Sequence, residues 1–214
     1  MHRLSGMDAS TIPLLLKSAL IGLSIAAPVG PIGLLCIKRS LNQGMAAGLA
    51  TGLGAATADG FYGAVAGFGL ASISGFLMAQ QTPLRLVGGL VLVWLGLTSF
   101  RDRPAVERAV KNARGLLAAY GTTVLLTLTN PATIISFAAV FASVGLAETA
   151  ASYGAAASFV AAVFAGSALW WVALSGAVSL VRARVTPAAI RWINRGSGLV
   201  LIGFGVSAWA SLLA

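Results

Sequence analysis

The chain of 214 residues has 58% hydrophobic and only 9% charged side chains, whereas a soluble domain carries about a quarter charged residues. Because so few charges cannot cover a water-facing surface, the composition excludes an ordinary soluble domain. The formal net charge of +9 does not indicate a nucleic-acid partner, because the basic residues cluster between apolar stretches. One cysteine and one histidine exclude an intramolecular disulfide and a structural zinc site, and we expect no cofactor.

Apolar stretches long enough to cross a membrane follow one another along the whole chain. A helix needs roughly 20 apolar residues to span the hydrocarbon core, which is about 30 Å thick. The intervals between charged residues predict an all-α membrane protein with six transmembrane helices in a single domain, residues 1–214. The predicted spans are 12–37, 44–71, 84–100, 116–146, 154–181 and 196–214.

The first span contains two prolines, Pro28 and Pro31, on either side of Gly30. A proline inside a helix lacks an N–H and clashes with the carbonyl four residues earlier, so these two free the carbonyls of Ser24 and Ala27. Irregular backbone at membrane depth survives only where it is buried in protein or lines a wet cavity. We therefore expect a broken helix here and place Pro28, Gly30 and Pro31 in a binding site.

The second span holds one acidic residue, Asp59, about midway along its length. An ionisable group at this depth is costly, usually faces the protein interior and is a functional candidate. We expect Asp59 to bind a solute or an ion and to exchange a proton; the alternative is a protonated side chain that only joins two helices. Small residues recur every four positions along this span and predict close helix packing: Gly44, Gly48, Gly52, Ala56 and Gly60.

The fourth span repeats the interruption of the first, because Pro131 frees the carbonyl of Thr127 and Asn130 adds amide donors and acceptors. Freed carbonyls, hydroxyls and amides suit a zwitterion, whose ammonium needs acceptors and whose carboxylate needs donors. A kink that only shapes packing is the alternative, but two breaks at matching places favour a site. In the fifth span, Ser167 occupies the position that corresponds to Asp59, and we include it in the site.

Most basic residues follow the first, third and fifth spans. Eleven of the 14 lysines and arginines lie there: Lys38, Arg39, Arg101, Arg103, Arg108, Lys111, Arg114, Arg182, Arg184, Arg191 and Arg195. Basic loops stay in the cytoplasm during insertion, so we expect these loops inside a bacterial inner membrane and both termini outside. Lys17 and Arg85 lie near outer span ends, where their side chains can reach water, and we assign them no role.

The two halves of the chain resemble each other. Second and fifth spans align at an offset of 108, and two glycines of the third span recur in the sixth at an offset of 109: Gly89 and Gly96 against Gly198 and Gly205. With three spans in each half, the second copy is inserted upside down. Inverted repeats with broken helices are a transporter architecture in which the solute binds between the halves. We therefore predict a 3+3 inverted repeat with broken helices 1 and 4, its halves covering about 12–100 and 116–214.

The chain resembles the LysE/RhtB-type amino-acid exporters in five segments that follow one another in order and spacing: residues 27–33, 38–44, 52–59, 129–131 and 166–171. The resemblance implies a six-helix secondary transporter, not an enzyme, that exports amino acids or close derivatives by alternating access, using an ion gradient. It also implies site roles for particular residues. These are Pro28, Gly30 and Pro31 in the first break, Asp59 as the acidic position, and Asn130 and Pro131 in the second break.

The expected partners are membrane lipid, a small amino-acid-like solute and a coupling ion, taken to be a proton; a homo-oligomer is left open. An exporter of metal or inorganic ions is the alternative within transport, but such sites want several carboxylate, histidine or thiolate ligands. A membrane enzyme would need a paired acid and base, whereas only Asp59 is available at depth. A non-transporting assembly protein would leave the two breaks unexplained. The sequence contains no Walker-type loop, so direct ATP drive would require another subunit.

Overall fold

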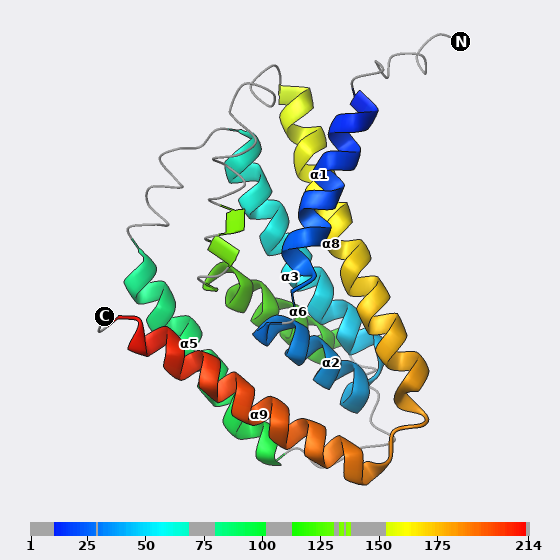
Figure 1. Ribbon diagram of the computed structural model, residues 1–214, viewed down its shortest axis with the longest axis vertical. Helices are drawn as coiled ribbons and strands as arrows, with labels where there is room; N and C mark the ends of the chain where they lie inside the picture. The colour runs from blue at the N-terminus through cyan, green and yellow to red at the C-terminus, as the bar shows by residue number, and fades with distance from the viewer. Residues whose placement is uncertain are drawn as a thin grey trace.

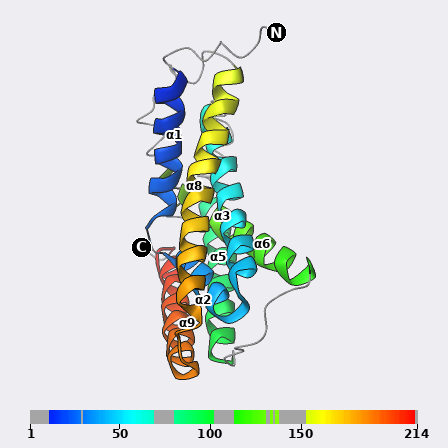
Figure 2. The ribbon, with the colours of Figure 1, turned by 90° about the vertical axis from the view of Figure 1, so that its right-hand side faces the viewer.

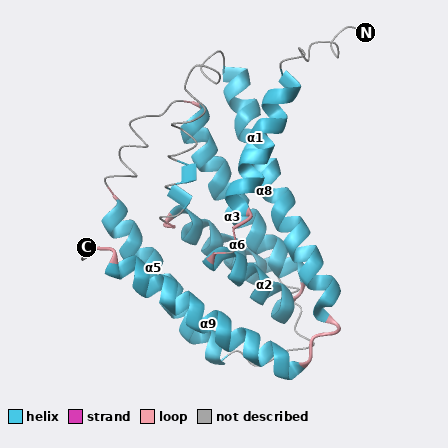
Figure 3. Ribbon diagram, viewed as in Figure 1, coloured by secondary structure: helices cyan, strands magenta, loops and turns pink. Residues whose placement is uncertain are grey.

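The structure is a computed structural model, and the residues that it describes are 11–28, 30–68, 80–101, 113–130, 133–134, 136–137 and 153–212. Within these ranges the chain forms helices with defined bounds and no strand, which confirms the predicted all-α class for this part (Figure 1, Figure 3). The helices are α1 (Thr11–Ala26), α2 (Pro31–Gln43), α3 (Met45–Gly67), α5 (Gln81–Arg101), α6 (Ala113–Leu128), α8 (Tyr153–Arg182) and α9 (Pro187–Ala210).

Two antiparallel helix pairs organise the bundle. The helices α3 and α8 pack along each other, and α5 packs along α9 (Figure 1). The helix α1 lies on α8, while α6 lies on α3 and projects sideways from it (Figure 2). The short helix α2 contacts α3, α8 and α9, so it sits where the two pairs meet.

Some of the described helices have the length and apolarity of a membrane span. The helices α5, over Thr82–Phe100, and α8 each qualify alone, and α1 with α2 forms a third candidate whose arms meet at 79°. The helix α6 is apolar but has only 16 residues. The helices α3 and α9 do not qualify. Glycines, threonines and Asp59 lower the mean hydropathy of α3, and Arg191 and Arg195 lower that of α9. Six spans therefore stay a prediction, and the predicted segments 69–71 and 138–146 lie outside the described residues.

The prediction of a loop directly after residue 37 is wrong. The helix α2 continues to Gln43, so Lys38 and Arg39 are helical, and the Lys38 side chain is only 6% exposed. The reason is Gly44, whose φ of 93° lies in the left-handed region that favours glycine and lets the chain turn directly into α3. The loop after α8 is also shorter than predicted, because Thr186 caps α9, accepting a hydrogen bond from the Ala189 N–H at 3.2 Å.

Glycines bring helix backbones into direct contact at several interfaces, including that of α3 with α6, where a Cβ at Gly54 would lie 2.5 Å from the Tyr120 oxygen. A Cβ at Gly166 of α8 would collide with the Ala19 carbonyl of α1. The same close approach joins α5 to α9 through four glycines that face each other in pairs. A Cβ on Gly96 would lie 2.7 Å from the Gly198 oxygen, and one on Gly205 would lie 2.7 Å from the Gly89 oxygen. These contacts explain why small residues are needed where the helices cross.

We expect Gly166→Ala to lower the stability of the folded protein by about 1–3 kcal/mol, because α1 and α8 must move apart to admit the methyl group. Gly176→Ala on the same helix is the matched control, since nothing lies within 4 Å of a Cβ at that position. Its effect should stay within about 1 kcal/mol. Thermal unfolding of the two variants in the same detergent checks this, and equal melting temperatures would contradict the close contact.

Candidate functional site

The first break separates α1 from α2 completely. The helix α1 ends at Ala26, Gly30 is extended at φ −103°, and Pro31 occupies the first turn of α2. A proline suits this position because the N–H that it lacks would have no helical partner there. The Gly30 N–H donates to the Pro28 carbonyl at 2.9 Å. The prolines therefore end one helix and begin the next, instead of kinking a single helix.

The second break follows α6, which ends at Leu128. The hydroxyl of Tyr62, on α3, donates to the Leu128 carbonyl at 2.7 Å and so satisfies an oxygen that the helix end leaves open. Beyond it, the Asn130 amide donates to the Thr133 hydroxyl at 3.0 Å, and the Asn130 carbonyl accepts from the Ile134 N–H at 3.1 Å. Pro131, predicted to cause this break, lies outside the described residues.

A buried chain of hydrogen bonds links α3 to α8 beside the breaks. The Ser167 hydroxyl donates to the Asp59 carboxylate at 2.6 Å, and the Trp171 indole N–H donates to the Ser167 oxygen at 3.2 Å. All three side chains are buried. Hydrogen bonds fix the Asp59 carboxylate in one orientation, and low polarity around it strengthens each bond.

A small cavity of about 50 Å³ adjoins this carboxylate. Its lining includes Asp59, Thr127, Asn130, Trp171 and the turn between α1 and α2. Thr127 is only 3% exposed, and its buried hydroxyl has no hydrogen-bond partner among the described residues. A buried hydroxyl without a partner is costly, so it marks a place where a ligand, an ion or water can bind.

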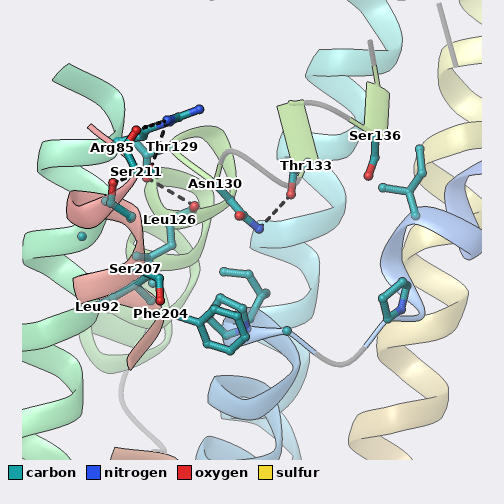
Figure 4. A pocket seen from close by; sticks show the side chains of 18 residues that line it. Arg85, Leu92, Leu126, Thr129, Asn130, Thr133, Ser136, Phe204, Ser207 and Ser211 are labelled. Carbon is teal, nitrogen blue, oxygen red and sulfur yellow. Dashed lines mark hydrogen bonds between the residues drawn. The ribbon is translucent and has the colours of Figure 1, made fainter. Parts of the chain in front are cut away.

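A larger cavity of about 370 Å³ adjoins the small one and shares the residues of both breaks. It lies among α5, α6 and α9, and Figure 4 shows Arg85, Thr129 and Ser211 close together at one end. The Arg85 guanidinium donates through Nη1 to the Ser211 hydroxyl at 3.0 Å and to the Ser211 carbonyl at 3.2 Å. Apolar side chains form much of the remaining wall, including Leu92, Leu126 and Phe204 (Figure 4).

The structure brings most of the predicted site residues together. Pro28, Gly30, Pro31 and Asn130 line both cavities, and Asp59 and Thr127 line the smaller one. Ser167 lines neither cavity and instead holds Asp59 from behind.

Sequence reasoning missed Arg85, which had been left without a role, and the serines of α9. A lone arginine near a span end and scattered serines in an apolar helix give no sequence signal of a cavity. In the part of the chain that the structure describes, no three His, Cys, Asp or Glu side chains gather. The site therefore offers one carboxylate, one guanidinium, hydroxyls, amides and backbone groups.

Comparison with known proteins gives a consistent result. The sequence matches the family described as LysE type translocator over residues 23–211. It is 29% identical over 196 residues to the "Putative amino acid efflux protein YcgF" of Bacillus subtilis (strain 168), covering 89% of this chain and 92% of that protein. It is 30% identical over 151 residues to the "Uncharacterized membrane protein YahN" of Escherichia coli (strain K12), covering 69% and 67% of the two chains. No solved structure matches the chain significantly.

We expect Thr127→Val to leave stability within about 0.5 kcal/mol of wild type, because its hydroxyl has no partner among the described residues. Thr123→Val, one turn earlier on α6, is the matched comparison. The Thr123 hydroxyl accepts from Arg39 at 3.0 Å, so this variant should lose about 1–3 kcal/mol by leaving a buried guanidinium with one acceptor fewer. Thermal unfolding in detergent measures both, and an equal loss would show that Thr127 has a partner.

Proposed function

Since the chain belongs to the LysE type translocator family, we propose that it is a secondary active exporter of amino acids or close derivatives. The observation that carries the proposal is the meeting of two interrupted helices around adjoining cavities beside a buried carboxylate. Irregular backbone supplies the donors and acceptors that a zwitterion needs, and a cavity of about 370 Å³ suits a small molecule. The B. subtilis relative, named as an amino acid efflux protein, supports the same solute class.

An inverted repeat of three plus three spans underlies this proposal. Exchanging the halves maps α1 to α6, α3 to α8 and α5 to α9. The packing of α1 on α8 then corresponds to that of α6 on α3, and α5 and α9 exchange with each other. Asp59 and Ser167, related by the offset of 108, bond directly to each other. This correspondence supports two halves that can exchange conformations, as alternating access requires.

The predicted orientation gives the two sides of the molecule distinct roles. We place the protein in the bacterial inner membrane with both termini outside, so the larger cavity, near the start of α5 and the end of α9, belongs to the outer half. Polar contacts of α2 close the opposite side. The Lys38 ammonium donates to Ser99 at 2.6 Å, and the amides of Asn42 and Asn194 bond reciprocally at 2.7 and 3.3 Å. These contacts support the proposal that the described conformation is closed on the cytoplasmic side.

Asp59 is the group through which we couple export to a proton gradient. It is the acidic residue of the described lining, and it accepts a hydrogen bond from Ser167 whether or not a proton sits on its second oxygen. Protonation would change the charge next to the first break without changing its shape. Such a change can bias which half of the protein is open.

Replacement of Asp59 tests the coupling. In proteoliposomes preloaded with a panel of labelled amino acids, Asp59→Asn should lose efflux driven by a pH gradient but keep exchange of solute at equal concentrations. The amide keeps the size and the Ser167 contact but cannot carry the proton. Phe61→Leu on the lipid-facing side of α3, 44% exposed, serves as the control. Gradient-driven efflux at the wild-type rate in Asp59→Asn would sink the coupling role.

The closed gate is tested by joining α2 to α9. In a Cys36→Ala background, cysteines replace Asn42 and Asn194, and a short bifunctional methanethiosulfonate links them through disulfide bonds. Because this pair holds the cytoplasmic side shut, the linked protein should stop transporting and recover when a reductant cleaves the reagent. Each single-cysteine variant treated in the same way should transport normally. Undiminished transport by the linked protein would refute the gate.

A further inference from the structure

The two cavities differ in charge. Arg85 is the only charged side chain among the described residues that line the larger cavity, whereas Asp59 belongs to the smaller one. We propose that the larger cavity binds an α-amino acid with an uncharged, largely apolar side chain through its carboxylate at Arg85, and that the smaller cavity takes the coupling ion, not the solute. This deepens the proposed export function and rests on it.

The position of Arg85 suits a carboxylate. Its guanidinium is held against the end of α9 by the two bonds to Ser211, with Thr129 beside it (Figure 4). A guanidinium carries five N–H donors in a planar fork whose spacing matches the two oxygens of a carboxylate. The Ser211 and Thr129 hydroxyls beside it already donate to the carbonyls of Ala208 and Leu125, both at 2.9 Å, so the guanidinium is the main donor at this end of the cavity.

The rest of the larger cavity selects the side chain. Leu92, Leu126 and Phe204 present apolar surface, and the oxygens of Asn130 and Thr133 can accept from the solute ammonium. The described lining holds no Asp or Glu. A lysine or arginine solute would thus bury a second positive charge without a counter-charge, and a glutamate would bring a second carboxylate to a single guanidinium. Unpaired charges are expensive to bury, so both are disfavoured.

The smaller cavity is too small for an amino acid. A water molecule takes about 30 Å³ in the liquid, so about 50 Å³ leaves room for one or two water-sized groups. Two oxygens concern us in its polar lining, which also includes Asn130 and Thr133. One belongs to Asp59, already oriented by Ser167, and the other is the unpartnered hydroxyl of Thr127. A proton carried by Asp59 or by water fits this space, and the solute stays in the larger cavity.

Counterflow in proteoliposomes of the purified full chain tests the assignment with leucine, lysine and glutamate as labelled solutes. We expect kcat/KM for leucine to exceed that for lysine and glutamate by about tenfold or more, the effect of one unpaired charge. Unlabelled leucinamide, which lacks the carboxylate, should compete poorly, whereas 4-methylpentanoate, which lacks the ammonium, should compete better.

Variants of Arg85 sharpen the test. Arg85→Gln should raise KM for leucine about tenfold or more and abolish the preference for leucine over leucinamide. The number of protons exchanged per leucine should stay unchanged. Arg85→Lys, which keeps the charge but not the planar fork, should fall between the two. Arg184→Gln, an exposed arginine in the turn after α8, is the matched control and should behave as wild type.

The outcomes separate the two proposals. If the wild type exchanges no amino acid at all, amino-acid export itself fails. If it exchanges lysine or glutamate as well as leucine, or if Arg85→Gln matches Arg184→Gln, export stands and the assignment of the larger cavity is overturned. Should Arg85→Gln fail to fold, Arg85→Lys and the leucinamide competition on the wild type decide the question.

Discussion

In the hydrocarbon core of a bilayer every backbone N–H and C=O group needs a partner inside the protein. The described N–H groups of the turn between α1 and α2 meet this requirement without a continuous helix. Ala27 and Gly30 find backbone acceptors at Leu23 and Pro28, both at 2.9 Å, and Pro31 has no N–H to satisfy. The turn borders both cavities. The irregular backbone of the break therefore lies beside the cavities in which we propose that the solute and the coupling ion bind.

The helix α2 beyond the turn is held from several sides. Arg39 reaches Thr51 on α3 and Thr123 on α6, while Arg182 of α8 donates to the Leu41 carbonyl at 2.8 Å. Lys38 adds a contact to α5. Buried cations are tolerated when hydrogen bonds replace their hydration. These contacts fix the second arm of the break at 79° to the first and so give the cavities their walls.

Local chemistry made part of this architecture predictable. The helical class follows from the length of the apolar runs, the first break from two prolines, and the relation of Asp59 to Ser167 from a constant offset. Tertiary contacts were not accessible in the same way. The rule that basic loops stay inside counts charges and ignores their partners, so Lys38 looked like a loop residue although Ser99 holds it in the interior. Arg85 was missed because the sequence alone does not distinguish an arginine that reaches water from one that lines a cavity. The contact that distinguishes them is with Ser211, which follows 126 residues later in the chain.

The short length of α2 sets an order of assembly in the bilayer. With 13 residues it cannot cross a core of about 30 Å by itself, and two of its polar side chains find their partners much later in the chain. Ser99 follows Lys38 by 61 residues, and Asn194 follows Asn42 by 152. These two contacts of α2 therefore cannot form before α5 and α9 have been synthesised. The helix that borders the site thus gains its last polar partner only when all but about 20 residues of the chain have been made.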